Sequence, residues 1–248
     1  MSAIKTRKSD HVAEDLMRRI VSGEYEVGSV LPREQELAES YGMTRGVIRE
    51  AIKLLEVHRL VEPVRRRGTE VLDPRASLSP EVLRAMLRRP DGSIDGEVLA
   101  DLLELRSDID LQMTNLAAKR RRPEDVRRMR EQLEVIRQSA DHIDDFNDAL
   151  KDLTLLIARA SGNRIFSMLV HWHERVRGDI GTAMIATRRP TEAMMQGLSF
   201  LVESIAAGDE DTVRSIVRAF HEWATPQILE IATGRPEDPR RRVTEIPS

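Results

Sequence analysis

The sequence predicts a mainly α fold, in which three short helices and a β-hairpin come first and an all-α helical bundle follows. Apolar residues recur at helical spacing through most of the 248 residues. Hydrophobic residues make up 40% of the chain but aromatic residues only 3%. Aliphatic side chains must therefore form the core, which favours helices over an aromatic-rich β-barrel. The length is typical of two domains.

The composition excludes several kinds of protein. The chain contains no cysteine, which excludes disulfides, thiolate metal sites and a cysteine nucleophile. It also contains no apolar stretch near the ~18 residues that a membrane span requires, and no hydrophobic signal segment at its start. We therefore expect a soluble, cytoplasmic protein with no membrane partner.

The first domain is expected to span residues 1–73. Apolar residues four apart predict a first helix between residues 11 and 23. A second helix is expected to start at Pro32, since proline is a favourable first helical residue. It is expected to stop at Gly42, because glycine suits a left-handed helix cap.

A third helix and a hairpin complete this domain. Thr44 can cap a helix over residues 45–58. Residues 60–72 then combine β-favouring valines with the tight basic turn Arg65-Arg66-Arg67-Gly68. Helix, helix, glycine turn, helix and basic hairpin is the order of a winged helix-turn-helix.

The third predicted helix has an apolar face and a basic face. Arg45, Arg49 and Lys53 form a stripe roughly 110° from the apolar cluster on the helical wheel. A helix lying in the DNA major groove presents cations in this way, and Gly46 would let the backbone approach DNA closely. The alternative is that these arginines only solvate the outer face. The glycine turn before the helix and the basic hairpin after it favour DNA binding.

The rest of the chain is expected to form a linker, a helical domain and a tail. Proline and glycine clusters in residues 74–96 predict a linker with one short helix, residues 81–88. Residues 97–233 follow helical spacing, which predicts an all-α bundle that includes one long helix over residues 164–186. The tail, residues 234–248, is rich in proline and arginine and is expected to be disordered.

Several motifs resemble the GntR-type bacterial transcription regulators of the FadR subgroup. Their helix-turn-helix signature is similar to Leu31-Pro32-x-Glu34-x-Glu36-Leu37-Ala38 followed by Gly42-Met43-Thr44-Arg45-x-x-x-Arg49-Glu50-Ala51, and their wing to Gly68-Thr69-x-Val71. Their C-terminal domain is similar to Leu102-x-x-x-Arg106, Ala160-Ser161-Gly162-Asn163 and Ala206-x-Gly208-Asp209. The resemblance spans about residues 10–230.

This resemblance implies a homodimer that binds a short palindrome in double-stranded DNA. The family commonly has an arginine where Gln35 stands. Glutamine prefers adenine edges where arginine prefers guanine, so a changed half-site sequence is expected. Arg65 and Arg66, at the tip of the wing, suit the minor groove or the phosphates. The candidate DNA-binding residues are Arg33, Gln35, Thr44, Arg45, Gly46, Arg49, Arg65, Arg66 and Gly68.

The metal site that many relatives carry is expected to be absent. The positions of the ligands in those relatives are occupied here by Leu150, Thr154 and Leu198, and only His221 remains. One imidazole cannot hold an ion that needs at least three protein ligands. We therefore predict no metal and no cofactor.

Leucines in place of metal ligands make the bundle interior more apolar, which suits a hydrophobic effector. The acyl-CoA-responsive regulators of fatty-acid metabolism in the same subgroup also lack the metal site. Long-chain acyl-CoA is therefore the leading effector hypothesis, although Phe220 and Trp223 stand where those regulators have small residues. Another small metabolite, a carboxylate or no effector at all are the alternatives.

Three residues of the second domain are candidates for effector binding: Arg106, His221 and Trp223. Arg106 could pair with an anionic group of the effector, or else form an ion pair with Asp110 four residues on. His221 could contact the effector, but a hydrogen-bonded pocket or core histidine is the favoured interpretation.

The sequence thus predicts a ligand-responsive regulator of transcription, and two other classes of protein fit it less well. An enzyme is not expected. Ser161 could be considered as a nucleophile, but nothing places a base beside its hydroxyl, and a helix corner explains that residue. A DNA-architectural protein without ligand sensing would need only residues 1–73. A helical domain about twice that size argues for sensing and dimerisation.

Overall fold

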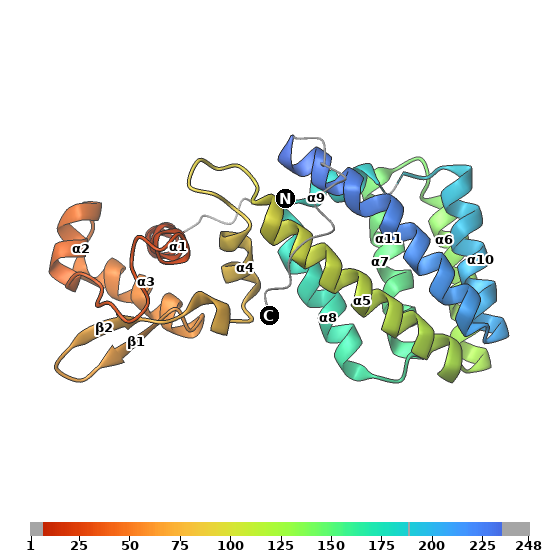
Figure 1. Cartoon of the computed structure of the whole chain (residues 1–248), viewed down its shortest axis with the longest axis horizontal. Coiled ribbons are helices and arrows are strands. Elements are labelled where there is room, and N and C mark those ends of the chain that lie inside the picture. Colours follow the sequence, from red (N-terminus) through yellow and green to blue (C-terminus); the bar gives the residue numbers. More distant parts are fainter. Residues whose placement is uncertain (1–6, 188, 235–248) are drawn as a thin grey trace, which may run out of the picture. The chain divides into compact units, whose positions relative to one another are not determined.

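The computed structural model describes residues 7–187 and 189–234 and is mainly helical (Figure 1). The predicted fold class is confirmed. The chain divides into two compact units, the first ending at Asp95 and the second beginning at Gly96. The predicted tail, residues 234–248, lies outside the described residues apart from Gly234. Within the described residues, no helix combines the length and apolarity needed to cross a membrane.

The first unit holds the expected helices and hairpin, together with the short helix predicted over residues 81–88. Its elements are α1 (Lys8–Val21), α2 (Glu34–Tyr41), α3 (Arg45–Val57), β1 (Val61–Val64), β2 (Gly68–Val71), the 3-10 turn η1 (Pro74–Ala76) and α4 (Pro80–Met86). The two strands are antiparallel, with Val61 opposite Val71 and Val64 opposite Gly68. The second helix begins two residues later than predicted, because the backbone N–H of Arg33 is capped by the Glu36 carboxylate (2.9 Å).

The predicted linker, residues 74–96, is not a separate segment. Residues 74–95 belong to the first compact unit, in which α4 packs against α1. Val82 is fully buried in the same core as Leu16 and Ile20. This packing depends on contacts between residues far apart in the sequence, so the local proline and glycine signals could not indicate it.

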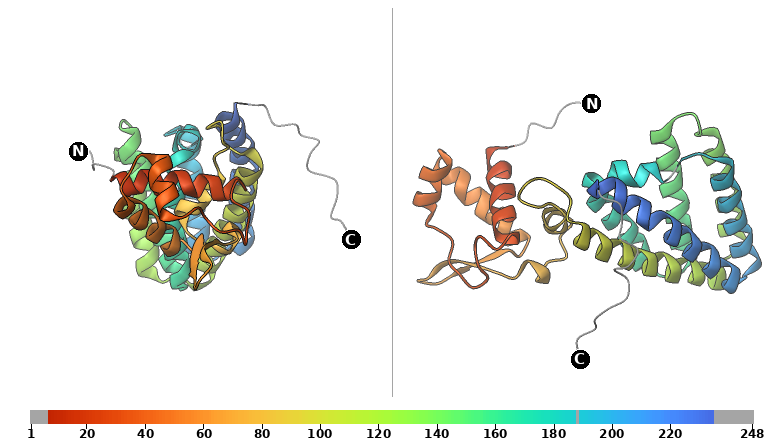
Figure 2. Two further views of the ribbon diagram at one scale, coloured as in Figure 1. Left: turned by 90° about the vertical axis from the view of Figure 1, so that its left-hand side faces the viewer. Right: turned by 45° about the horizontal axis from the view of Figure 1, so that its top comes forward.

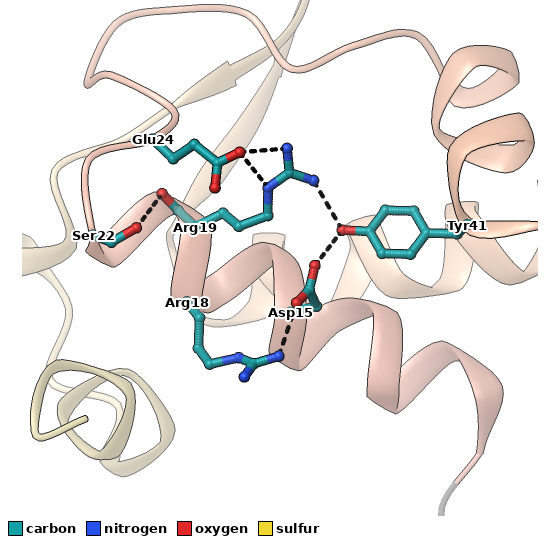
Figure 3. A network of polar contacts seen from close by, with 6 residues as sticks. All are labelled: Asp15, Arg18, Arg19, Ser22, Glu24 and Tyr41. Atoms are coloured by element: carbon teal, nitrogen blue, oxygen red, sulfur yellow. Dashed lines mark hydrogen bonds and ion pairs between the residues drawn. The ribbon is translucent and has the colours of Figure 1, made fainter. Parts of the chain in front are cut away.

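A polar network joins α1 to the end of α2 (Figure 3). The Tyr41 hydroxyl donates a hydrogen bond to Asp15 Oδ2 (2.6 Å) and accepts one from Arg19 Nη1 (3.3 Å). Arg19 also donates to Glu24 through Nε (2.9 Å) and Nη2 (2.6 Å). Burial and the hydrogen bond to Asp15 raise the pKa of Tyr41 to about 12. The phenol therefore stays protonated at neutral pH and holds α2 in place at the turn that leads to α3.

The second unit consists of packed helices. They are α5 (Gly96–Arg120), α6 (Pro123–Gln138), α7 (Ile143–Ala160), α8 (Arg164–Val176), the 3-10 turn η2 (Arg177–Asp179), α9 (Gly181–Ala186), α10 (Glu192–Ala207) and α11 (Glu210–Thr233). The two longest helices, α5 and α11, lie side by side (Figures 1 and 2). Phe146 and Met129 are among the fully buried side chains of the core.

The long helix predicted over residues 164–186 is wrong as a single element. It is interrupted by η2 between α8 and α9. Two glycines, Gly178 and Gly181, fall at the interruption, and glycine weakens a helix because it loses the most backbone freedom on folding. The apolar residues on either side of the break, Val176 and Ile180, are nevertheless buried, which explains why the helical spacing continues through it.

Glycine corners end two helices of the bundle. After α7, Gly162 has φ +70° and the Asn163 side chain accepts a hydrogen bond from the N–H of Ile165 (3.0 Å), as the predicted stop and cap require. After α10, Gly208 has φ +75°, and a Cβ there would lie 2.6 Å from Arg121 Nη1. Arg121 in turn donates to the carbonyl of Ala206 (3.2 Å and 3.3 Å). Each corner thus satisfies backbone groups that a helix end leaves unpaired.

Candidate DNA-binding surface and ligand cavity

α3 divides into a buried face and an exposed basic face, as predicted. Ile48, Ala51, Ile52 and Leu55 are buried, whereas Arg45, Arg49 and Lys53 are exposed. The Thr44 hydroxyl accepts a hydrogen bond from the N–H of Val47 (3.4 Å) and caps the helix. Gly46 is also exposed. Three cations one helical turn apart can therefore reach a polyanion while the opposite face anchors the helix.

The cations at the start of α3 contact polar side chains of α2. Arg49 binds Glu34 through two hydrogen bonds, Nη2 to Oε2 (2.7 Å) and Nε to Oε1 (3.1 Å). This hydrogen-bonded contact with Arg49 lowers the pKa of Glu34. Arg45 Nε donates to the amide oxygen of Gln35, and Gln35 Nε2 donates to Glu39. Any contact of Gln35 with an adenine edge would have to share or replace these two hydrogen bonds.

Arg33 stands at the cap of α2 and is exposed next to the same surface. Arg65 and Arg66 are exposed in the turn between β1 and β2, and Arg66 has φ +68°. The third arginine of this turn, Arg67, forms an ion pair with Glu70 (3.1 Å). The structure therefore places each DNA-binding candidate on α2, α3 or the wing. Their contacts with DNA remain predictions.

The base of the wing is held by a segment that the sequence did not indicate. The N–H of Leu31 donates to the carbonyl of Thr69, and the N–H of Val71 to the carbonyl of Ser29, both at 2.8 Å. At the start of β2, Gly68 has φ +117°, and a Cβ there would lie 2.9 Å from Val30 Cγ1. Any other residue at this position would be strained by the positive φ and would force the Val30 side chain to move.

We expect Gly68→Ala to lower the free energy of unfolding by about 1–3 kcal/mol, the usual cost of such a strained backbone. It should also weaken DNA binding by displacing the wing. Urea unfolding checks the first effect. Gly46→Ala is the matched control, because its new Cβ would come no closer than 3.9 Å to Thr44 Oγ1 and alanine favours a helix. Equal stabilities of the two variants would contradict this account of Gly68.

The second unit contains a cavity of about 470 Å³, within the range typical of ligand sites. Its wall comes mainly from α5, α7, α10 and α11 and is largely apolar. The apolar residues that line it include Met113, Leu150, Leu153, Ile157, Met194, Leu198, Leu201, Ile216, Val217 and Phe220. The three candidate effector residues, Arg106, His221 and Trp223, all line this cavity. Their contact with an effector remains a prediction.

Asp110 links two of these candidates, and the sequence had suggested it only as an alternative partner of Arg106. Its Oδ2 lies 3.4 Å from Arg106 Nε and 3.1 Å from His221 Nε2. Burial raises the pKa of Asp110, but the hydrogen bond with His221 and the charge of Arg106 outweigh it, so the pKa is lowered. The ion pair considered for Arg106 and the hydrogen bond considered for His221 are thus both present, on the wall of the cavity.

The positions that hold a metal in many relatives of the predicted family meet at this cavity. Leu150, Thr154, Leu198 and His221 all line it. Aliphatic side chains offer no ligand atoms, and the described residues contain no group of three or more His, Cys, Asp or Glu that could hold a metal ion. The residues present therefore do not fit a divalent metal.

Comparisons with known proteins match a separate family to each of the two compact units. Residues 8–71 match the model of the bacterial regulatory proteins of the gntR family, and residues 101–222 match the FCD domain. These families and the relatives below are transcriptional regulators, not enzymes.

Two curated relatives cover most of the chain. Rv0494 of Mycobacterium tuberculosis, described as an uncharacterized HTH-type transcriptional regulator, is 27% identical over 87% of this chain and 87% of its own length. The fatty acid metabolism regulator protein of Salmonella paratyphi C is 26% identical over 88% of this chain and 89% of its own. Among solved structures, Lar, which controls the Listeria monocytogenes agr system, is 16% identical with a TM-score of 0.57, covering 93% of this chain and 100% of Lar. That similarity shows the fold.

Proposed function

We propose that this chain, whose residues 8–71 match the gntR family of bacterial regulatory proteins and whose residues 101–222 match the FCD domain, is an FadR-type regulator of lipid or fatty-acid metabolism. In this proposal a homodimer binds a short palindromic operator, with one α3 helix in the major groove of each half-site. A long-chain acyl-CoA binds in the cavity of the second unit and releases the DNA.

The observation that carries the effector class is the lining of the cavity. An apolar wall around about 470 Å³ suits a hydrocarbon chain, because burying apolar surface stabilises binding by ~25 cal/mol per Å². Leu150 and Leu198 supply apolar surface at positions where a metal ligand would favour a small chelating acid. The similarity to the fatty acid metabolism regulator protein of Salmonella paratyphi C, which spans both units, supports the link to fatty acids.

The DNA-binding half rests on the exposed cations of α3 and on the wing. A dimer on a palindrome would present two such surfaces related by a two-fold axis, which is how helix-turn-helix dimers read their half-sites. A ligand that binds the DNA-free form better than the DNA-bound form would lower operator affinity by that difference. Such coupling between two sites is typically roughly 5-fold to 150-fold.

Fluorescence anisotropy at fixed salt tests the proposal, with DNA from upstream of the protein's own gene as the probe. Micromolar oleoyl-CoA is expected to weaken binding by at least about fivefold, and free CoA to leave it unchanged. Sedimentation of the complex should give two chains per operator. Tight binding that oleoyl-CoA does not alter, but that a small carboxylate does, would overturn the lipid effector and favour the second candidate, a regulator of small-acid metabolism. Binding unaffected by either class would favour a protein without ligand sensing.

A further inference from the structure

The residues that line the cavity differ sharply in exposure. Met113, Leu153 and His221 are buried, which marks the interior end. Arg189 and Trp223 are exposed, together with neighbouring wall residues of α10, which marks the mouth. The cavity therefore has a closed, mainly apolar part and an open part that remains in contact with water.

The charged groups at the interior end neutralise one another. Arg106 carries one positive charge, and Asp110 carries one negative charge 3.4 Å away. His221 shares the same carboxylate oxygen at 3.1 Å. An anionic group that entered here would have to displace Asp110 from Arg106 or lie beside the Asp110 carboxylate. Both are unfavourable, because a like charge or a broken ion pair in a poorly hydrated site costs free energy.

At the mouth of the cavity, the charges do not neutralise one another in this way. Arg189 lines the cavity from the segment that precedes α10, and its side chain is exposed. Within residues 7–187 and 189–234, no carboxylate forms an ion pair with it. Trp223 adds a flat aromatic surface that is 53% exposed, with its ring centroid 6.2 Å from that of Phe220. A guanidinium suits phosphate oxygens, and an exposed indole suits the stacking of a nucleotide base.

From this arrangement we propose that the ligand is a long apolar chain joined to a phosphorylated nucleotide, whose phosphates bind Arg189 at the mouth. The chain occupies the apolar part of the cavity, and Arg106 stays paired with Asp110. This inference rests on the proposed effector class and adds to it the residue that recognises the anionic end. It assigns Arg106 to the wall of the cavity and not to the charged group of the ligand.

Displacement of an uncharged fluorescent probe, N-phenyl-1-naphthylamine, from the full-length protein tests the inference. Oleoyl-CoA and oleyl alcohol share the apolar chain, and only the first carries phosphates. We expect Arg189→Gln to weaken the binding of oleoyl-CoA roughly tenfold, which is the effect of losing one charge-assisted contact. The binding of oleyl alcohol should be unchanged. Arg214→Gln is the matched control, because Arg214 is an α11 arginine whose side chain is 40% exposed and paired with Asp211 and which lies outside the cavity wall.

A second variant separates the two ends of the cavity. Asp110→Asn removes the carboxylate that pairs with Arg106. If the phosphates lay beside Arg106, this variant should bind oleoyl-CoA more tightly and oleyl alcohol no more tightly. We expect no such selective gain.

If Arg189→Gln does not change the binding of oleoyl-CoA, or if Asp110→Asn strengthens it selectively, this inference is wrong. The proposed effector class would then remain intact. Failure of both oleoyl-CoA and the alcohol to displace the probe from the unaltered protein would instead overturn the lipid effector, and this inference with it.

Discussion

Replacing Arg45 and Arg49 together by alanine is expected to lower operator affinity by roughly 100-fold to 1,000-fold, since each good arginine contact with a base or phosphate contributes about a tenfold factor or more. Both side chains are exposed on α3 and their removal leaves the buried face of the helix untouched. Without Arg49, the Glu34 carboxylate also loses its partner at 2.7 Å and would repel DNA phosphates. Anisotropy titrations at several salt concentrations measure the loss.

The salt dependence identifies what the two arginines contact. If both neutralise phosphates, the slope of log affinity against log salt should fall by roughly two. Arg127→Ala/Arg128→Ala removes the same charge from exposed positions on α6, where each arginine is paired within its own helix, and should change neither affinity nor slope appreciably. A double α3 variant that still bound the operator at moderate salt would refute the placement of α3 in the groove.

The helix-turn-helix of the first unit was predictable because its signals are local. Thr44 caps α3 through a group three residues away, and Gly42 ends α2 with φ +60°. Such turn and cap chemistry acts within a few residues, so the sequence carries it directly. The division of α3 into two faces follows from helical periodicity for the same reason.

Features that depend on contacts between residues far apart in the chain could not be predicted from the sequence in this way. The packing of Val82 on α1 is invisible in residues 74–96, whose prolines and glycines suggest a linker. Asp110 and His221 are separated by 111 positions along the chain, and no spacing rule joins them. The cavity itself depends on the gap left between whole helices. Only the substitution of leucines for expected metal ligands hinted that this gap would be apolar.

Leu198→Trp is expected to abolish the response to oleoyl-CoA while leaving operator binding intact. Leu198 is half-buried and lines the cavity from α10, so a larger side chain can extend into space that is already present without displacing the core. Filling that space removes the volume that the acyl chain needs, whereas α3 and the wing belong to the other compact unit. The release of DNA by oleoyl-CoA, expected to be at least about fivefold in the unaltered protein, should fall to less than about twofold.

Phe200→Trp provides the matched control, because Phe200 lies on the same helix but is 58% exposed and is not part of the cavity wall. It introduces the same indole on the same element and should keep the full response. If both variants unfold with a midpoint temperature close to that of the unaltered protein, the fold is preserved. If Leu198→Trp remains folded and still releases DNA at the same oleoyl-CoA concentration, the ligand acts from somewhere other than this cavity. The apolar lining on which the effector class rests would then be only a structural consequence of helix packing.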